Sequence, residues 1–256
     1  MATFWVALAA VLIVFMVKDR GAPREDTPAL LVERLRELSR GVTILFDQRS
    51  ILITAIVRII CNLTLFGFPV IMPLYLTSAE IGFTMEQWLH LWGVMFIVTI
   101  FTNVIWGWVG DRIGWLRQMR WFGCVGCALA TLAFYYLPLM YGAHFELAIV
   151  AAVALGICVS AFVPMGAVFL AISPERQGAA ISAHNLAAGL SNFMGPAIAT
   201  LTISWLGVQG VVWVYASLYL LGAVLTCFIR VEQPKLGAEA EPVPHFPTRP
   251  GAGQAI

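Results

Sequence analysis

Arg58 is the residue whose chemistry and position stand out most clearly in this 256-residue chain. It lies inside a long apolar run, residues 51–76, whereas thirteen of the other fourteen Lys and Arg residues lie outside such runs and Arg120 lies at the start of one. A charge within an apolar run of membrane length is costly and usually marks a functional site. Its guanidinium can donate several hydrogen bonds to a carboxylate or a hydroxyl. We therefore predict that Arg58 binds a solute, with snorkelling toward the membrane surface as the alternative.

Amide and hydroxyl side chains recur at helical spacing inside three of the apolar runs. Residues three, four or seven positions apart share one face of a helix. An asparagine offers both a donor and an acceptor, which suits vicinal hydroxyls, whereas an anionic solute would suit Arg58 better. Each group alone is also explained by a hydrogen bond between helices. Beside Arg58, the predicted solute-binding residues are Asn62, Thr99, Asn103, Asn185 and Asn192.

His184 is the buried group most suited to proton transfer, because imidazole titrates near neutral pH. We predict a proton-relay role for it. The runs from residue 51 onward hold no Asp or Glu at mid-depth, so a carboxylate for proton coupling is expected outside them. Cys124 and Cys127 have the spacing of metal ligands, but no His joins them and two small buried residues are expected instead. We expect no metal, no cofactor and no enzyme activity.

The elements that must position these groups are seven apolar runs. Hydrophobic residues make up 60% of the chain and charged residues 11%, compared with roughly 45–50% and about 25% in soluble proteins. A helix needs about 20 apolar residues to cross a bilayer. The composition therefore predicts an all-α polytopic membrane protein with a lipid bilayer as partner and without nucleic acid. The seven predicted transmembrane helices are 2–17, 51–76, 87–108, 119–141, 145–172, 178–205 and 211–229.

The basic residues predict how these helices cross the membrane. Apart from Arg58, the Lys and Arg residues fall in segments that follow the first, third, fifth and seventh run, with Arg120 at the start of the fourth. The loops 77–86, 141–146 and 206–210 contain none. Because basic loops stay in the cytoplasm, we predict a multi-pass protein of the cell (inner) membrane with a cytoplasmic C-terminus.

Four regions follow from these patterns. Residues 1–17 form a single transmembrane helix without a basic lead, which indicates the last helix of a missing N-terminal half. Residues 18–50 form a cytoplasmic linker, in which leucines at helical spacing predict an amphipathic helix. Residues 51–230 form a six-helix transmembrane bundle. Residues 231–256, rich in Pro, Gly and Glu, form a disordered cytoplasmic tail.

Two loop sequences carry a family resemblance. The segment Gly107-Trp-Val-Gly-Asp111-Arg112-Ile-Gly114 resembles the signature loop of the major facilitator superfamily. The segment Ser173-Pro-Glu175-Arg176-Gln-Gly is similar to a second loop of these carriers. The expected physics is a close helix approach at Gly107 and a tight turn at Gly114. The resemblance implies an inner gate in which Glu175 and Arg176 pair with Arg112 and Asp111. The predicted gating residues are Gly107, Asp111, Arg112, Gly114, Glu175 and Arg176.

The resemblance also implies a function. It matches the C-terminal half of a twelve-helix carrier plus one preceding helix, and the chain is most similar to the polyol permease branch, which handles ribitol and arabinitol. It implies a proton-coupled secondary active transporter for a small polar solute such as a sugar alcohol, present here as an incomplete chain. The runs 51–76, 87–108, 145–172 and 178–205 would then line the cavity. The alternatives are a carrier of a small organic anion such as a dicarboxylate, or a seven-helix receptor.

Overall fold

The computed structural model describes residues 43–231, which belong to a single unit of the chain that begins at Glu37. The predicted helix 2–17 and the tail beyond residue 231 lie outside the described residues. So does the linker up to residue 42, which contains the predicted amphipathic helix. Within 43–231 the elements are helices and turns, and the all-α prediction is confirmed.

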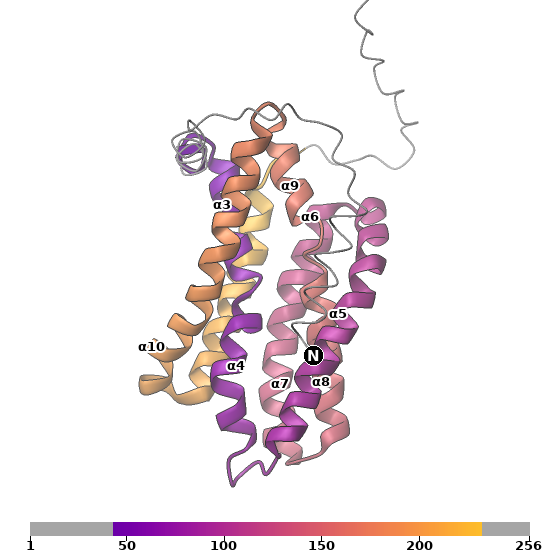
Figure 1. The fold of residues 1–256 in the computed structure, drawn as a ribbon, viewed down its shortest axis with the longest axis vertical. Coiled ribbons are helices and arrows are strands. Elements are labelled where there is room, and N and C mark those ends of the chain that lie inside the picture. The colour runs from indigo at the N-terminus through magenta and orange to yellow at the C-terminus, as the bar shows by residue number, and fades with distance from the viewer. Residues whose placement is uncertain (1–42, 232–256) are drawn as a thin grey trace, which may run out of the picture. The chain divides into compact units, whose positions relative to one another are not determined.

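The predicted runs from residue 51 onward all become helices (Figure 1). Five stretches are long and apolar enough to cross a membrane within the described residues. The fifth contains the last two predicted runs, which part at Gly207, where the backbone is non-helical with φ 62° and ψ −172°. The helices are α3 (Arg49–Ile60), α4 (Leu63–Leu76), α5 (Met85–Ile113), α6 (Trp115–Gln118), η1 (Met119–Val125), α7 (Gly126–Tyr141), α8 (Phe145–Ser160), α9 (Met165–Ile172), η2 (Pro174–Arg176), α10 (Gln177–Leu225) and η3 (Thr226–Phe228).

Two of the spans are broken partway across. The first is interrupted at Cys61 and Asn62, between α3 and α4. The second is interrupted at residues 161–164, between α8 and α9, where Pro164 caps α9. Broken helices leave backbone and side-chain polar groups free near mid-membrane, where carriers bind their solutes. These breaks therefore mark the part of the bundle in which a site is expected.

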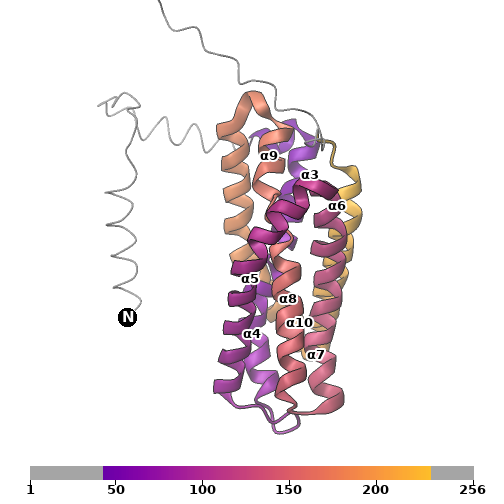
Figure 2. The same cartoon turned by 90° about the vertical axis from the view of Figure 1, so that its right-hand side faces the viewer.

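Helices α3 and α4 lie against α10, beside the α7–α8 pair (Figures 1 and 2). Tyr215 of α10 donates a hydrogen bond to the Gly195 carbonyl at 2.7 Å, and its ring lies against Gly67 of α4, where a Cβ atom would collide with it. Tyr219 shares a 2.8 Å hydrogen bond with the Thr64 hydroxyl. Both tyrosines are fully buried. Their hydroxyls thus reach polar partners in an apolar interior, as buried tyrosines require.

Basic residues gather at one end of this bundle, whereas acidic residues occur at both. The turns that follow α4 and α7 and the turn at Gly207 lie at one end, the lower end in Figure 1. The acidic residues there are Glu80, Glu86 and Glu146, and that end carries no Lys or Arg. The opposite end carries Arg49, Arg112, Arg117, Arg176 and Arg230. The described helices therefore alternate in direction as the basic residues predict.

Candidate functional site

The break between α3 and α4 places Asn62 against α10. Its Nδ2 donates to the Ser191 Oγ at 3.1 Å, and the Ser191 hydroxyl donates to the Ala188 carbonyl at 2.6 Å. Ser191 is buried and Asn62 is half-buried. Asn62 is thus partly engaged in a contact between two helices. For Asn62 the sequence left two roles open, solute binding and a hydrogen bond between helices, and this contact is of the second kind.

Arg58 lies one turn before Asn62, at the end of α3. Its Nη1 donates to the Cys61 sulfur at 3.0 Å, and the Cys61 thiol donates to the Arg58 carbonyl at 3.0 Å. The Arg58 Nε is buried without a partner. Among residues 43–231, the one ion pair within 4 Å joins Asp47 to Arg176, so Arg58 has no carboxylate partner there.

His184 of α10 completes the polar groups near this break. The edge of its ring meets Phe169 of α9, with the ring centres 5.1 Å apart. Its Nδ1 is buried without a partner among residues 43–231. The Asn62–Ser191 hydrogen bond joins the two segments, one turn after Arg58 and about two turns after His184. The two basic side chains predicted for separate roles therefore lie in one neighbourhood.

Asn185 and Asn192 lie on one face of α10, because seven residues correspond to about two helical turns. Both are exposed in this unit, and neither has a side-chain hydrogen bond within residues 43–231. Asn103 of α5 is half-buried and equally unbonded among the described residues. These three amides remain available to a ligand.

Thr99 has a different environment, because its hydroxyl bonds to the Met95 carbonyl at 2.8 Å and to the Gly156 carbonyl at 3.3 Å. The next turns of α5 continue this contact with α8. Thr102 and Ser160 share a 2.7 Å hydrogen bond, and the Trp106 indole donates to the Ile157 carbonyl at 2.8 Å. These polar contacts join the two helices. The spacing 99, 102, 106 along one face was the sequence signal for them.

The signature loop lies at the basic end of the bundle. Asp111 accepts a hydrogen bond from the Trp115 Nε1 at 3.0 Å, and the Arg112 guanidinium lies over the Trp108 ring at 3.4 Å. Gly114 has φ 93°, the left-handed conformation that favours glycine. Asp111 is therefore fixed beside Trp115, the first residue of α6.

The close helix approach expected at Gly107 is made by another glycine of α5. A Cβ atom added at Gly107 would meet no atom of the described residues within 4 Å. One added at Gly110 would lie 2.7 Å from the Oε1 of Gln118. Gln118 is fully buried and donates from Nε2 to the Ala161 carbonyl at 3.0 Å.

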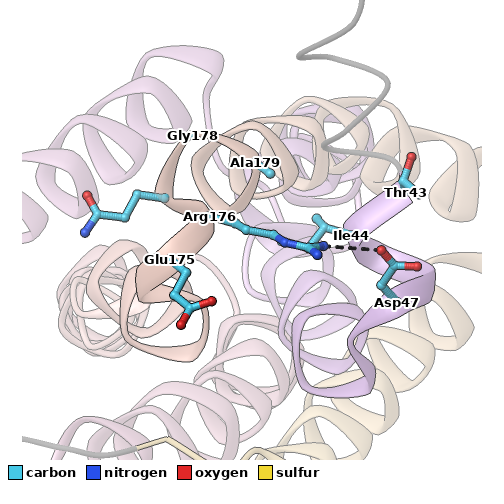
Figure 3. A pocket seen from close by; sticks show the side chains of 8 residues that line it. Thr43, Ile44, Asp47, Glu175, Arg176, Gly178 and Ala179 are labelled. Carbon is cyan, nitrogen blue, oxygen red and sulfur yellow. Dashed lines mark hydrogen bonds and ion pairs between the residues drawn. The ribbon is translucent and has the colours of Figure 1, made fainter.

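Glu175 and Arg176 lie in η2, beside the start of α10, where they line a cavity of about 470 Å³ (Figure 3). Arg176 Nη1 is 3.4 Å from Asp47 Oδ2, and both side chains are more than half exposed. The expected pairing of Glu175 and Arg176 with Arg112 and Asp111 is not made among the described residues. Arg176 pairs with Asp47 instead, a residue that the sequence did not single out.

A metal centre is not formed by residues 43–231, which contain no cluster of three or more suitable ligands. Cys61, Cys124 and Cys127 are buried as free thiols inside the bundle. Cys227 is the exposed thiol of the described residues.

Comparison with known proteins gives the following matches. Residues 125–254, just over half of the chain, match the Major Facilitator Superfamily. The chain is 48% identical over 239 residues to a ribitol transporter and 46% identical over 239 residues to a D-arabinitol transporter, both from Klebsiella pneumoniae. It is 37% identical over 234 residues to an alpha-ketoglutarate permease from Bacillus subtilis (strain 168). These alignments cover 91% of this chain but 56%, 56% and 52% of the relatives, so the chain spans about half their length.

Proposed function

Because this chain belongs to the major facilitator superfamily, we propose that it forms the C-terminal half of a secondary active transporter whose cargo is a sugar alcohol. The observation that carries the proposal is the similarity, at 48% and 46% identity over 91% of this chain, to relatives named as transporters of ribitol and D-arabinitol. The partners in this proposal are the lipid bilayer, the solute and an N-terminal half of the carrier.

The free amides support this cargo. A sugar alcohol carries a hydroxyl on every carbon, and each hydroxyl both donates and accepts. Asn103, Asn185 and Asn192 offer the same two capacities and are unbonded within residues 43–231. In the proposed carrier their faces on α5 and α10 line the solute path together with the α3–α4 break. Arg58, Asn62 and Thr99 flank that path.

Transport in this proposal proceeds by rocking of the two halves around the solute. The basic end of the bundle is the cytoplasmic side of the inner membrane, since basic loops stay inside. The inner gate uses the loop from Gly107 to Gly114 together with Glu175 and Arg176. His184 relays the coupling proton, and the carboxylate that accepts it belongs to the N-terminal half.

A second cargo, a small organic anion, is favoured by one observation. Arg58 is a cation without a carboxylate partner in residues 43–231, and a relative at 37% identity is named as an alpha-ketoglutarate permease. A buried guanidinium binds carboxylates through paired hydrogen bonds. Uptake of labelled 2-oxoglutarate and of labelled ribitol by the same cells separates the two cargoes.

The experiment for the proposed function measures uptake of labelled ribitol and D-arabinitol by cells that express the complete carrier. Asn185→Ala and Asn192→Ala are each expected to reduce uptake by roughly tenfold, because each removes hydrogen bonds to the solute. Ser204→Ala is the matched control, since Ser204 is exposed on the same helix and bonds only to its own turn. Absence of polyol uptake by the unmodified carrier would contradict the proposal.

A further inference from the structure

Two nitrogen atoms inside the membrane-spanning part of the bundle have no partner among residues 43–231. They are the Arg58 Nε and the His184 Nδ1, and both atoms are buried. Buried polar groups in proteins are nearly always hydrogen-bonded, so an orphaned group calls for an explanation. These two atoms come from α3 and α10, which pack against each other beside α9.

The contact that Arg58 does make is a weak one. Its Nη1 donates to the sulfur of Cys61, and a neutral thiol is a poor acceptor. None of the acidic residues in 43–231 lies within 4 Å of Arg58. The Arg58 side chain is half-buried, and a cation that loses solvation without gaining a counter-charge is unfavourable. Arg58 therefore has the capacity to bind an anion that this part of the chain does not supply.

His184 lies where it can share that anion. It is seven residues, about two turns, before Ser191 on the same face of α10, and Arg58 is one turn before Asn62, which bonds to Ser191. The rings of His184 and Phe169 meet in a T-shaped contact. An imidazole nitrogen that carries its proton donates to an oxygen acceptor. Asn62 already uses one of its two amide N–H groups on Ser191. The buried nitrogens without any partner in this neighbourhood are those of Arg58 and His184.

We propose that Arg58 and His184 together bind a carboxylate group. A carboxylate presents two oxygens in one plane, which match the guanidinium fork, and it carries the single negative charge that one Arg neutralises. A phosphate, with a charge between −1.5 and −2, would be left under-compensated. The carboxylate comes from an anionic solute or from an acidic side chain of the other half of the carrier. The second source rests on the proposed function.

Binding is tested on this chain in lipid nanodiscs by ¹⁵N NMR of its histidines. The His184 resonance is assigned with His184→Gln, and the exposed His90 and His144 serve as internal controls. Sodium acetate, titrated against sodium chloride at equal ionic strength, is expected to shift the His184 resonance saturably and to leave the controls unchanged. Arg58→Gln is expected to weaken this effect by roughly tenfold or more, because a charge-assisted hydrogen bond is lost.

Arg58→Lys keeps the charge and is expected to retain part of the shift, which separates loss of binding from loss of folding. An unshifted His184 resonance, or an equal shift in Arg58→Gln, would overturn the proposal. The complete carrier then identifies the source. With a solute carboxylate, succinate shifts His184 in the carrier and is taken up. With a carboxylate of the other half, His184 resonates at the acetate-bound position before any acid is added.

A His184 resonance in the complete carrier that is neither shifted by succinate nor at the bound position would also overturn the proposal. Polyol uptake is measured separately in the same preparation. Failure of that uptake contradicts the proposed cargo and leaves the His184 result unchanged, so the two failures are distinguishable.

Discussion

Asp111 is held at the end of α5 by the indole of Trp115, which donates from Nε1 at 3.0 Å. Trp115 occupies a position at which the superfamily pattern often has a basic residue. In this chain the indole N–H of Trp115 therefore fixes the Asp111 carboxylate. Arg112 is turned onto the Trp108 ring. The loop is thus ordered within the described residues by two tryptophans, and Asp111 keeps oxygen lone pairs free for a partner.

This arrangement predicts that Trp115→Phe, which keeps the ring and removes the N–H, slows transport by roughly two- to tenfold. Asp111→Asn is expected to slow it at least as much while membrane insertion stays normal. The double variant should be no slower than Asp111→Asn alone, because both changes act through one contact. Initial uptake rates at equal carrier amounts in the membrane provide the measurement. Strictly additive losses would show that the two residues act independently.

Residue types could be predicted at this scale, but residue partners could not. A charge and several amides inside apolar runs identified Arg58, Asn185 and Asn192 without any structure. The Asn62–Ser191 and Asp47–Arg176 contacts each join residues 129 positions apart. Such contacts depend on how helices lie against one another, which hydrophobic periodicity does not specify. Thr99 illustrates the same limit, because its position in the sequence fits both a residue that lines a solute path and a residue of the α5–α8 interface.

At the scale of elements, the length of the apolar runs predicted the helices but did not predict where those helices are broken. The turn at 206–210 was predicted, and Gly207 is non-helical. The break at Cys61 and Asn62 has no proline of its own, whereas Pro69 and Pro73 lie inside the continuous helix α4. In a membrane helix, neighbouring groups re-satisfy the backbone at a proline. Proline position therefore did not locate the interruption that follows Arg58.

The α4–α10 contact yields a stability prediction. Gly67→Ala places a methyl group against the Tyr215 ring and is expected to cost ~1–3 kcal/mol, as overpacking does. Gly93→Ala is the matched control, because its Cβ atom would meet no described atom within 4 Å. Thermal unfolding of the detergent-solubilised protein should show a lower midpoint for Gly67→Ala and an unchanged or raised midpoint for Gly93→Ala. Equal midpoints for both variants would contradict the close packing.

At the scale of the whole molecule, the feature that sets the direction of the helices is the distribution of basic residues. Within residues 43–231 one end of the bundle carries the Arg residues of the loops and the other end carries none. That segregation was predictable from the sequence, because successive membrane spans run in opposite directions. The match to about half the length of the relatives bears on activity, since a rocking carrier needs two halves around its solute.

We therefore expect that this chain alone does not transport. Vesicles that contain only this polypeptide should take up labelled pentitol at the rate of empty vesicles. Co-expression with an N-terminal half should restore uptake above that background. Saturable uptake by the single polypeptide would show that one half, alone or as a dimer, is sufficient.

The central claim, that the Asn185–Asn192 face of α10 lines a sugar-alcohol path, is tested most directly by thiol protection. Gly189 lies between these residues, and a side chain there would meet no described atom within 4 Å. In a complete carrier with Cys227→Ser, Gly189→Cys should react with a water-soluble thiol reagent, whereas Leu201→Cys on the opposite face should not. We predict that ribitol or D-arabinitol slows labelling at position 189. Unreactive Gly189→Cys, or labelling that polyols leave unchanged, would contradict the account.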